Sequence, residues 1–122
     1  MLIIDDNVEF KTMISCFFTD LGFSVEQADG GRDGLANVRT VKPDVILLDV
    51  MMPDMGGIEV IRELQADDEM KAVPVLVITG SHFEGSMKDL FKQESNCREF
   101  LSKTIELTML QAKVELLLKK PK

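Results

Sequence analysis

Short strand-like runs alternate along the chain with longer segments in which apolar residues recur at helical spacings. The runs occupy residues 2–4, 24–28, 45–48, 75–78 and 100–101. Strands that alternate with helices over short connections form βαβ units, whose parallel sheets are covered by helices on both faces. The alternation therefore predicts a single α/β domain, residues 1–122, with a doubly wound five-stranded parallel sheet and helices on both faces.

The first helix is expected to begin at Asn7 and to end at Gly22, a residue that provides a helix stop. The residues that recur there at helical spacings are Val8, Met13, Phe17 and Leu21, with Phe10 and Ile14 beside them. The later helices are predicted around four groups of apolar residues: Leu35 and Val38; Ile58, Ile61 and Leu64; Met87, Leu90 and Phe91; and residues 105–118.

The sequence also predicts the structure of two segments between these elements. The fourth helix is expected to end near Asn96, because asparagine tolerates the left-handed conformation of many helix ends. Gly30, Gly31 and Gly34 follow the second strand and lack the order of a dinucleotide-binding fingerprint. We interpret these three as turn glycines.

Composition excludes several classes of function. A chain of 122 residues that is 45% hydrophobic forms one domain with one core. The net charge of −7 argues against direct nucleic-acid binding, because phosphate contacts need a basic face. No apolar stretch approaches the roughly 20 residues of a membrane span and no leader precedes the first strand, so we expect no membrane insertion. Cys16 and Cys97 are far apart and outside metal-ligand spacing, which favours a reducing cytoplasm.

Five polar residues stand where predicted strands end: Asp5, Asp6, Asp49, Thr79 and Lys103. The carboxyl ends of parallel strands meet at one edge of a sheet, so these side chains are expected to form one site. Clustered carboxylates need a cation, and oxygen ligands with water suit Mg²⁺. A carboxylate beside Mg²⁺ can attack phosphorus, while the lysine ammonium and threonine hydroxyl bind the phosphoryl oxygens.

Four sequence pieces carry a resemblance to a known family. They are Asp5-Asp6, residues 49–59 (DVMMPDMGGIE), residues 77–80 (VITG) and residues 100–103 (FLSK), in this order and at the family's spacing. Over essentially its whole length the chain resembles the receiver domain of bacterial two-component response regulators. The resemblance implies a flavodoxin-like (βα)5 fold.

The resemblance also implies a metal site and a phosphoacceptor. Asp49 would accept the phosphoryl group. Asp6 and Asp49 would bind Mg²⁺, or Mn²⁺ as its substitute, together with the backbone carbonyl of Met51, and Asp5 would hold the metal's water.

Further roles are implied around the phosphoryl group. Thr79, Gly80 and Lys103 would line its site, and Phe100 would turn inward as Thr79 moves toward the phosphate. Met51 and Ser81 occupy the two variable positions that modulate phosphate loss. Neither side chain suits the alignment of an attacking water, which predicts slow self-dephosphorylation.

Each of these residues also has a plainer interpretation. Asp5 or Asp6 could cap the first helix, Lys103 could be a surface lysine, and Thr79 a strand-end hydroxyl. Phe100 could belong to the core alone. The methionines at 51, 52 and 55 are expected to cover the core rather than bind metal, and His82 is expected to be an exposed loop residue.

Two departures from the family pattern stand out. Asn96 and Cys97 replace a common Gly-Ala pair. Thr104 replaces the proline that usually follows the lysine, and a cis bond before threonine costs about 2.5–4 kcal/mol. We therefore predict a trans Lys103–Thr104 bond, a rearranged loop before Ile105, and a lysine that still reaches Asp49.

The resemblance implies a phosphorylation switch rather than an enzyme. Its partners would be a histidine kinase or histidine phosphotransfer protein, and an output partner on the fourth helix, fifth strand and fifth helix, with a phosphorylation-dependent homodimer as a further alternative. Two other functions stay open: a pseudo-receiver that binds partners without phosphorylation, and an aspartyl-phosphate phosphohydrolase. The intact polar set argues against the former, and Met51 at the place of a second acid argues against the latter.

Overall fold

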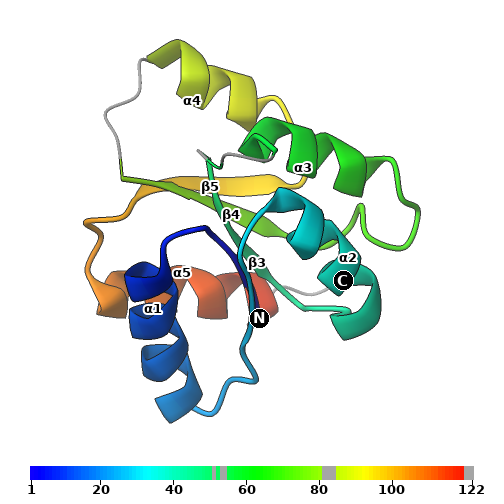
Figure 1. Cartoon of the computed structure of the whole chain (residues 1–122). Helices are drawn as coiled ribbons and strands as arrows, with labels where there is room; N and C mark the ends of the chain where they lie inside the picture. Colours follow the sequence, from blue (N-terminus) through cyan, green and yellow to red (C-terminus); the bar gives the residue numbers. More distant parts are fainter. Residues whose placement is uncertain (51, 53–54, 81–84, 120–122) are drawn as a thin grey trace.

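The computed structural model describes residues 1–50, 52, 55–80 and 85–119, with the backbone alone at residues 85–88 and 119. The elements alternate throughout (Figure 1). They are β1 (Leu2–Ile4), α1 (Val8–Asp20), β2 (Glu26–Ala28), α2 (Gly31–Val41), β3 (Ile46–Asp49), α3 (Gly57–Gln65), β4 (Val75–Thr79), α4 (Gly85–Lys92), β5 (Cys97–Ser102) and α5 (Leu107–Lys119). The predicted (βα)5 order is confirmed.

The strands form one five-stranded sheet in the order β2-β1-β3-β4-β5, and every neighbouring pair is parallel. The chain starts at β1 and adds β2 on one side, then returns to add β3, β4 and β5 on the other. The carboxyl ends of β1 and β3 therefore lie side by side, with Ile4 paired to Leu48. This reversal of direction is the place where ligand sites form in open α/β sheets.

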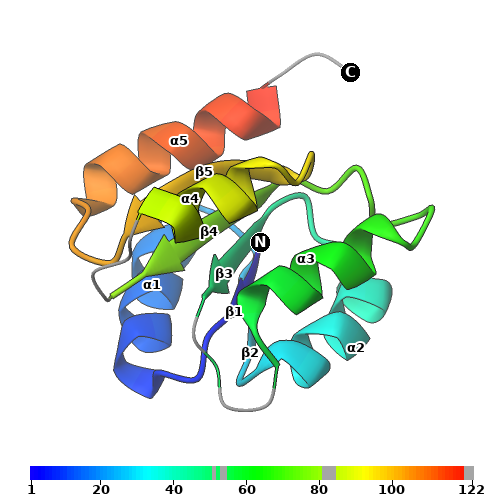
Figure 2. The same cartoon turned by 90° about the horizontal axis from the view of Figure 1, so that it is seen from above.

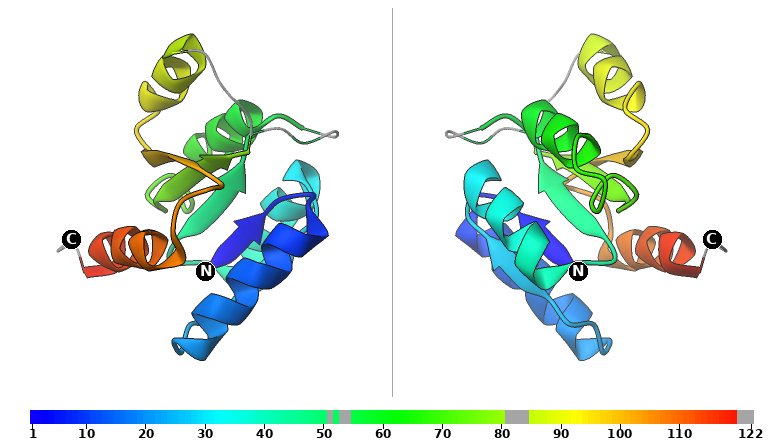
Figure 3. Two further views of the ribbon diagram at one scale, coloured as in Figure 1. Left: turned by 90° about the vertical axis from the view of Figure 1, so that its left-hand side faces the viewer. Right: turned by 90° about the vertical axis from the view of Figure 1, so that its right-hand side faces the viewer.

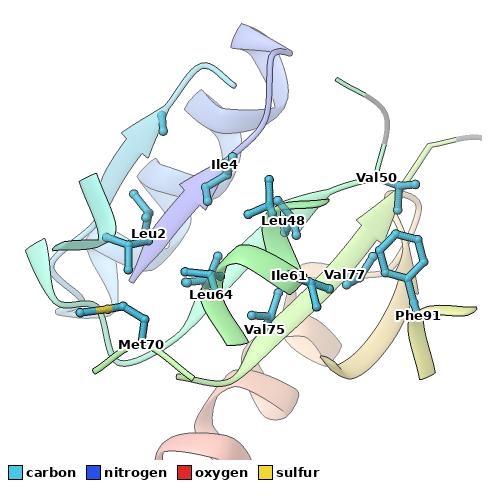
Figure 4. Packing of buried hydrophobic residues seen from close by; sticks show 14 residues of the cluster. Leu2, Ile4, Leu48, Val50, Ile61, Leu64, Met70, Val75, Val77 and Phe91 are labelled. Carbon is cyan, nitrogen blue, oxygen red and sulfur yellow. The ribbon is translucent and has the colours of Figure 1, made fainter. Parts of the chain in front are cut away.

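Helices cover both faces of the sheet, with α1 and α5 on one face and α2, α3 and α4 on the other (Figures 2 and 3). Successive strand residues point to opposite faces. In β1, Leu2 and Ile4 join the core under α2, α3 and α4, whereas Ile3 joins the core under α1 and α5. Figure 4 shows the first of these cores, in which Leu48 of β3 appears between Ile4 of β1 and Ile61 of α3. The central strands β1, β3 and β4 are therefore buried on both faces.

The inward face of α1 differs from the prediction. The helix buries Phe10, Ile14 and Phe18, one residue every turn, whereas Val8 and Met13 are 68% and 46% exposed. Leu21, the C-cap of the helix, is also exposed. The Phe18 ring packs edge to face against the rings of Phe17 and Phe23. The distances between ring centroids are 5.2 Å to Phe17 and 5.1 Å to Phe23. This aromatic packing under the sheet sets the rotation of the helix.

The glycines near the second strand serve packing rather than turns, so the turn-glycine interpretation is wrong for Gly31 and Gly34. Both lie inside α2. A Cβ atom on Gly34 would come 2.5 Å from Ile4 Cδ1, and one on Gly31 would come 2.7 Å from Met55 Cβ. Gly22 does adopt a left-handed φ of +96°, which confirms the predicted helix stop.

Asn96 also has another role than expected. The fourth helix ends at Lys92, and among the described non-glycine residues only Lys42 has a positive φ. Asn96 is 2% exposed, and its amide donates to the Ile61 carbonyl (3.2 Å) and accepts from Gln65 Nε2 (2.6 Å). The residue ties α3 to the start of β5 instead of ending α4.

The boundaries of the last elements also shift from those expected. The fifth strand is longer than predicted, and α5 begins at Leu107 rather than at residue 105. Over the described residues, no helix has the length and hydropathy required to cross a membrane.

Candidate functional site

Asp5 directly follows β1, and its carboxylate is buried. Its exposed fraction is 1%, and its N–H continues the sheet by donating to the Ala28 carbonyl at 3.1 Å. Asp5 Oδ1 accepts from the N–H of Asn7 at 2.8 Å, and Asn7 Oδ1 accepts from the N–H of Phe10 at 2.9 Å. Asn7 is therefore the N-cap of α1, and the interpretation of Asp5 or Asp6 as the cap is wrong.

Three carboxylates converge at this edge of the sheet. Asp49 ends β3 and is 5% exposed, while Asp6 is exposed to solvent. One carboxylate oxygen from each of Asp5, Asp6 and Asp49 lies within 4.8 Å of the others. Asp5 Oδ2 is buried, and its partner among the described residues is an ion-pair cation, Lys103, rather than a hydrogen-bond donor of the backbone. Hard oxygen donors of this kind, with one open side, fit a hydrated Mg²⁺ ion.

Lys103 brings a positive charge to the same place. Its Nζ atom lies 2.8 Å from Asp5 Oδ2 and 3.7 Å from Asp49 Oδ2. The lysine therefore reaches Asp49, as predicted, and contacts Asp5 more closely. A Cβ atom on Gly80 would lie 3.3 Å from Lys103 Cδ, so the absence of a side chain at Gly80 leaves the path of the lysine stem open.

The loop that carries Lys103 is a tight turn with a trans peptide bond. No cis peptide bond occurs among the described residues, so the predicted trans Lys103–Thr104 bond is confirmed. The N–H of Lys103 donates to the Thr79 carbonyl at 2.8 Å, and the N–H of Ile105 donates to the Ser102 carbonyl at 3.0 Å. The Ser102 and Thr104 hydroxyls are 2.7 Å apart. These bonds fix the backbone from which the lysine extends.

Of the remaining residues predicted from the sequence, the structure describes Thr79 and Phe100 but not Met51, Ser81 or His82. Thr79 ends β4 and is 5% exposed. Phe100 is half-buried on β5 and packs against the first core, with its ring centroid 5.5 Å from that of Phe91. This contact fits the core interpretation, and the switch role stays a prediction. Met51, Ser81 and the loop residue His82 lie outside the described residues.

The sequence pattern did not reveal one member of the site, Phe10. The Lys103 Nζ atom lies 4.7 Å from the centroid of its ring. Phe10 appears in the sequence as one apolar residue among several in α1, and only the rotation of the helix brings its ring to the lysine that follows β5. The spacing of five residues between Asp5 and Phe10 is the single signal that could have indicated proximity.

The sequence matches the response regulator receiver domain family over residues 1–115. The chain belongs to this family. It is 31% identical over 106 residues to PilH of Pseudomonas aeruginosa, covering 87% of this chain and 86% of PilH. It is 35% identical over 114 residues to the response regulator PleD of Caulobacter vibrioides, covering 93% of this chain and 25% of PleD.

The solved structures agree with this assignment. The chemotaxis protein CheY4 of Vibrio cholerae superposes with a TM-score of 0.87 at 29% identity, covering 96% of each chain. The chain is thus a receiver domain of the two-component response regulator type, with the phosphoacceptor function of that class. Receiver domains bind Mg²⁺ at an acidic pocket, and the three-carboxylate cluster provides one.

Proposed function

We propose that Asp49 accepts the phosphoryl group in this receiver domain. One observation carries the proposal: the Asp49 carboxylate lies within a cluster of three acids and 3.7 Å from the Lys103 ammonium. A nucleophilic carboxylate, a cation site and a fixed ammonium are the groups that phosphoryl transfer to an aspartate requires. Asp6 is exposed and Asp5 is paired closely with Lys103, so Asp49 is the better nucleophile.

Asp6 and Asp49 would hold Mg²⁺ or Mn²⁺ directly together with the backbone carbonyl of Met51, and Asp5 would hold a water of the ion. The bound ion supplies positive charge that offsets the charge of the phosphoryl oxygens. Without it, an anionic donor would face three carboxylates and, among the described residues, the one ammonium of Lys103.

Each residue of the site would have its own role in the phosphoryl transfer. An Asp49 carboxylate oxygen forms a bond to phosphorus as the bond from phosphorus to the donor breaks, and the electron pair leaves with the donor. For a phosphohistidine donor, the departing imidazole nitrogen keeps that pair. Lys103 and the Thr79 hydroxyl bind the phosphoryl oxygens, and Gly80 leaves room for them. Inward rotation of Phe100 would then follow the movement of Thr79.

The donor would be a histidine kinase or a histidine phosphotransfer protein, and the output surface would comprise α4, β5 and α5. PleD, of which the match covers only a quarter, supports the use of such a domain within larger regulators. The exposed thiol of Cys16 suits a reducing compartment such as the cytoplasm. The activity would be that of a switch with slow self-dephosphorylation, because Met51 and Ser81 do not align a water.

Acetyl phosphate provides the test of the acceptor. Intact mass spectrometry should show one phosphate adduct that needs Mg²⁺ or Mn²⁺ and that is absent in Asp49→Ala. Asp20→Ala, which removes an exposed aspartate at the end of α1, is the matched control and should retain the adduct. An equal adduct on Asp49→Ala would contradict the assignment.

Phosphate turnover separates the three functional classes. A pseudo-receiver would form no adduct, a switch would form one adduct that decays slowly, and a phosphohydrolase would release many phosphates per chain. In the switch, Met51→Asn combined with Ser81→Glu should accelerate the decay. Decay that is unchanged in the double variant would mean that access of water, rather than its alignment, limits the rate.

A further inference from the structure

The Lys103 ammonium also contacts the ring of Phe10, a residue that has no role in the phosphoryl transfer described above. At 4.7 Å from the ring centroid, the ammonium is within the range of a cation–π contact. The lysine side chain is 18% exposed and Phe10 is 8% exposed. Little water screens the contact, so its strength belongs to the upper part of the range for such pairs.

One capped turn presents both the ring and a carboxylate to this ammonium. The side chain of Asn7 accepts from the N–H of Phe10, and the N–H of Asn7 donates to Asp5. Asp5 Oδ2 then lies 2.8 Å from Lys103 Nζ. The segment from Asp5 to Phe10 therefore fixes the ammonium from two directions, by charge and by the face of a ring.

The two contacts respond differently to a bound cation. A divalent ion at the carboxylates competes with Lys103 for Asp5 and Asp49 and repels the ammonium. The ring carries no net charge, so its attraction for the ammonium persists. Lysine has a long stem with several rotamers, and an ammonium released from its carboxylates would otherwise extend into solvent. Of the three contacts that described residues make with the Lys103 ammonium, the one with Phe10 would remain when a cation is bound.

We propose that Phe10 is a positioning residue whose ring holds the Lys103 ammonium beside Asp49 during phosphoryl transfer. The inference rests on the proposed phosphoacceptor function and adds a residue on α1 to it. Gly80 and the turn at residues 102–105 set the start and path of the lysine stem, and Phe10 sets its end.

Three variants separate positioning from general packing. Phe10→Leu keeps an apolar side chain and removes the ring face, whereas Phe10→Tyr keeps the ring. Phe18→Leu removes a fully buried ring from the same helix, away from the site, and is the matched control. Each protein is first compared by its melting temperature, so that the loss of core packing is measured separately.

The first readout is the rate of phosphorylation by acetyl phosphate in saturating Mg²⁺. Phe10→Leu should lower the maximal rate about thirtyfold, the loss expected when a desolvated cation–π contact is removed. Phe10→Tyr should restore most of the rate, and Phe18→Leu should leave it unchanged even if its melting temperature falls. A rate lowered equally by Phe18→Leu, or not lowered by Phe10→Leu, would overturn the inference.

The second readout does not depend on phosphorylation. In protein labelled with ¹³C-lysine, the ε-methylene protons of Lys103 should be shifted upfield by the ring current, and Lys103→Arg identifies the signal. Phe10→Leu should abolish the shift, while Phe10→Tyr and Phe18→Leu should keep it. If acetyl phosphate fails to phosphorylate the wild-type protein but the upfield shift of Lys103 is present, the acceptor function alone is contradicted. If the Lys103 methylene signal is unshifted in the presence of Mg²⁺, the role of Phe10 is contradicted.

Discussion

The two ends of the sheet both bury polar side chains, yet they bury them in opposite ways. At the carboxyl end, the carboxyl groups of Asp5 and Asp49 share one ammonium, that of Lys103, at 2.8 Å and 3.7 Å. At the amino end, the neutral amide of Asn96 both donates to Ile61 and accepts from Gln65. The exposed fractions are similar, so burial alone does not distinguish them.

The difference lies in satisfaction and charge. A neutral buried group with its hydrogen bonds made stabilises a fold, whereas clustered carboxylates that outnumber the nearby cations repel one another unless a further cation joins them. The amino end therefore holds α3 and β5 together, and the carboxyl end keeps a cluster of three acids that a cation would stabilise. This comparison gives each end its own mutational signature.

The largest effect should come from Asp49→Asn at the carboxyl end. The variant should lose the phosphate adduct completely, because an amide is not a nucleophile toward phosphorus. Without Mg²⁺ it should also be more stable than wild type by about 1 kcal/mol, since one of three mutually repelling carboxylates is neutralised. Urea unfolding in EDTA checks the second effect. A loss of stability would mean that the contact with Lys103 outweighs the repulsion between the acids.

Mg²⁺ should relieve the repulsion between the acids at the carboxyl end of the sheet and leave the amino end unaffected. At about one hundred times its dissociation constant, an ion that binds only the folded chain raises the free energy of unfolding by about 2.7 kcal/mol. Thermal melting with and without Mg²⁺ measures this gain. Asp6→Asn should remove most of the gain in melting temperature, whereas Asp20→Asn should leave it unchanged. A melting temperature indifferent to Mg²⁺ would remove the distinction between the two ends.

Asn96→Ala tests the amino end. The change leaves the Ile61 carbonyl and the Gln65 amide without their partner, which should cost about 2 kcal/mol of unfolding free energy. The rate of phosphorylation should stay at the wild-type value in conditions where the variant is folded. Gln65→Ala should cost less, because that side chain is only half-buried. A slower phosphorylation of Asn96→Ala would show that the two ends are coupled.

The smallest effect concerns Cys97, which follows Asn96. Burial, with the nearby Glu99 and Glu94, raises the pKa of this thiol from 9.0 to about 11. A folded-state pKa above the unfolded value gives stability that is present below pH 9 and is lost as the pH rises through 11. The melting temperature should therefore fall less steeply over this window in Cys97→Ala than in wild type. Equal slopes would place the pH dependence in other groups.

The sequence was enough to predict the sheet and the edge at which the site forms. Apolar runs that end in Asp49, Thr79 and Lys103 locate three strand ends, because parallel strands point their carboxyl ends the same way. The trans peptide after Lys103 was also predictable, since threonine lacks the low cost of cis proline.

Contacts made by helix rotation were not predictable from the sequence. Consecutive Phe17 and Phe18 could each define the inward face of α1, and Lys11, which is 2% exposed and pairs with Asp29, belongs to no apolar pattern. The contact of Phe10 with Lys103 depends on that rotation. The capping role of Asn7 was hidden by two aspartates beside it, each an equally good cap.

The close approach of α2 to β1 has a consequence for how the molecule opens. Gly34, inside the helix, disfavours it by roughly 1 kcal/mol relative to alanine, so α2 depends for its helical form on the surface of Ile4 against which that glycine lies. Amide hydrogen exchange should therefore report α2 as a unit that opens more readily than α3, whose glycine stands only at its first residue. Alanine at position 34 would raise helix propensity and still loosen the segment, because the helix would be held away from the strand that gives it its shape.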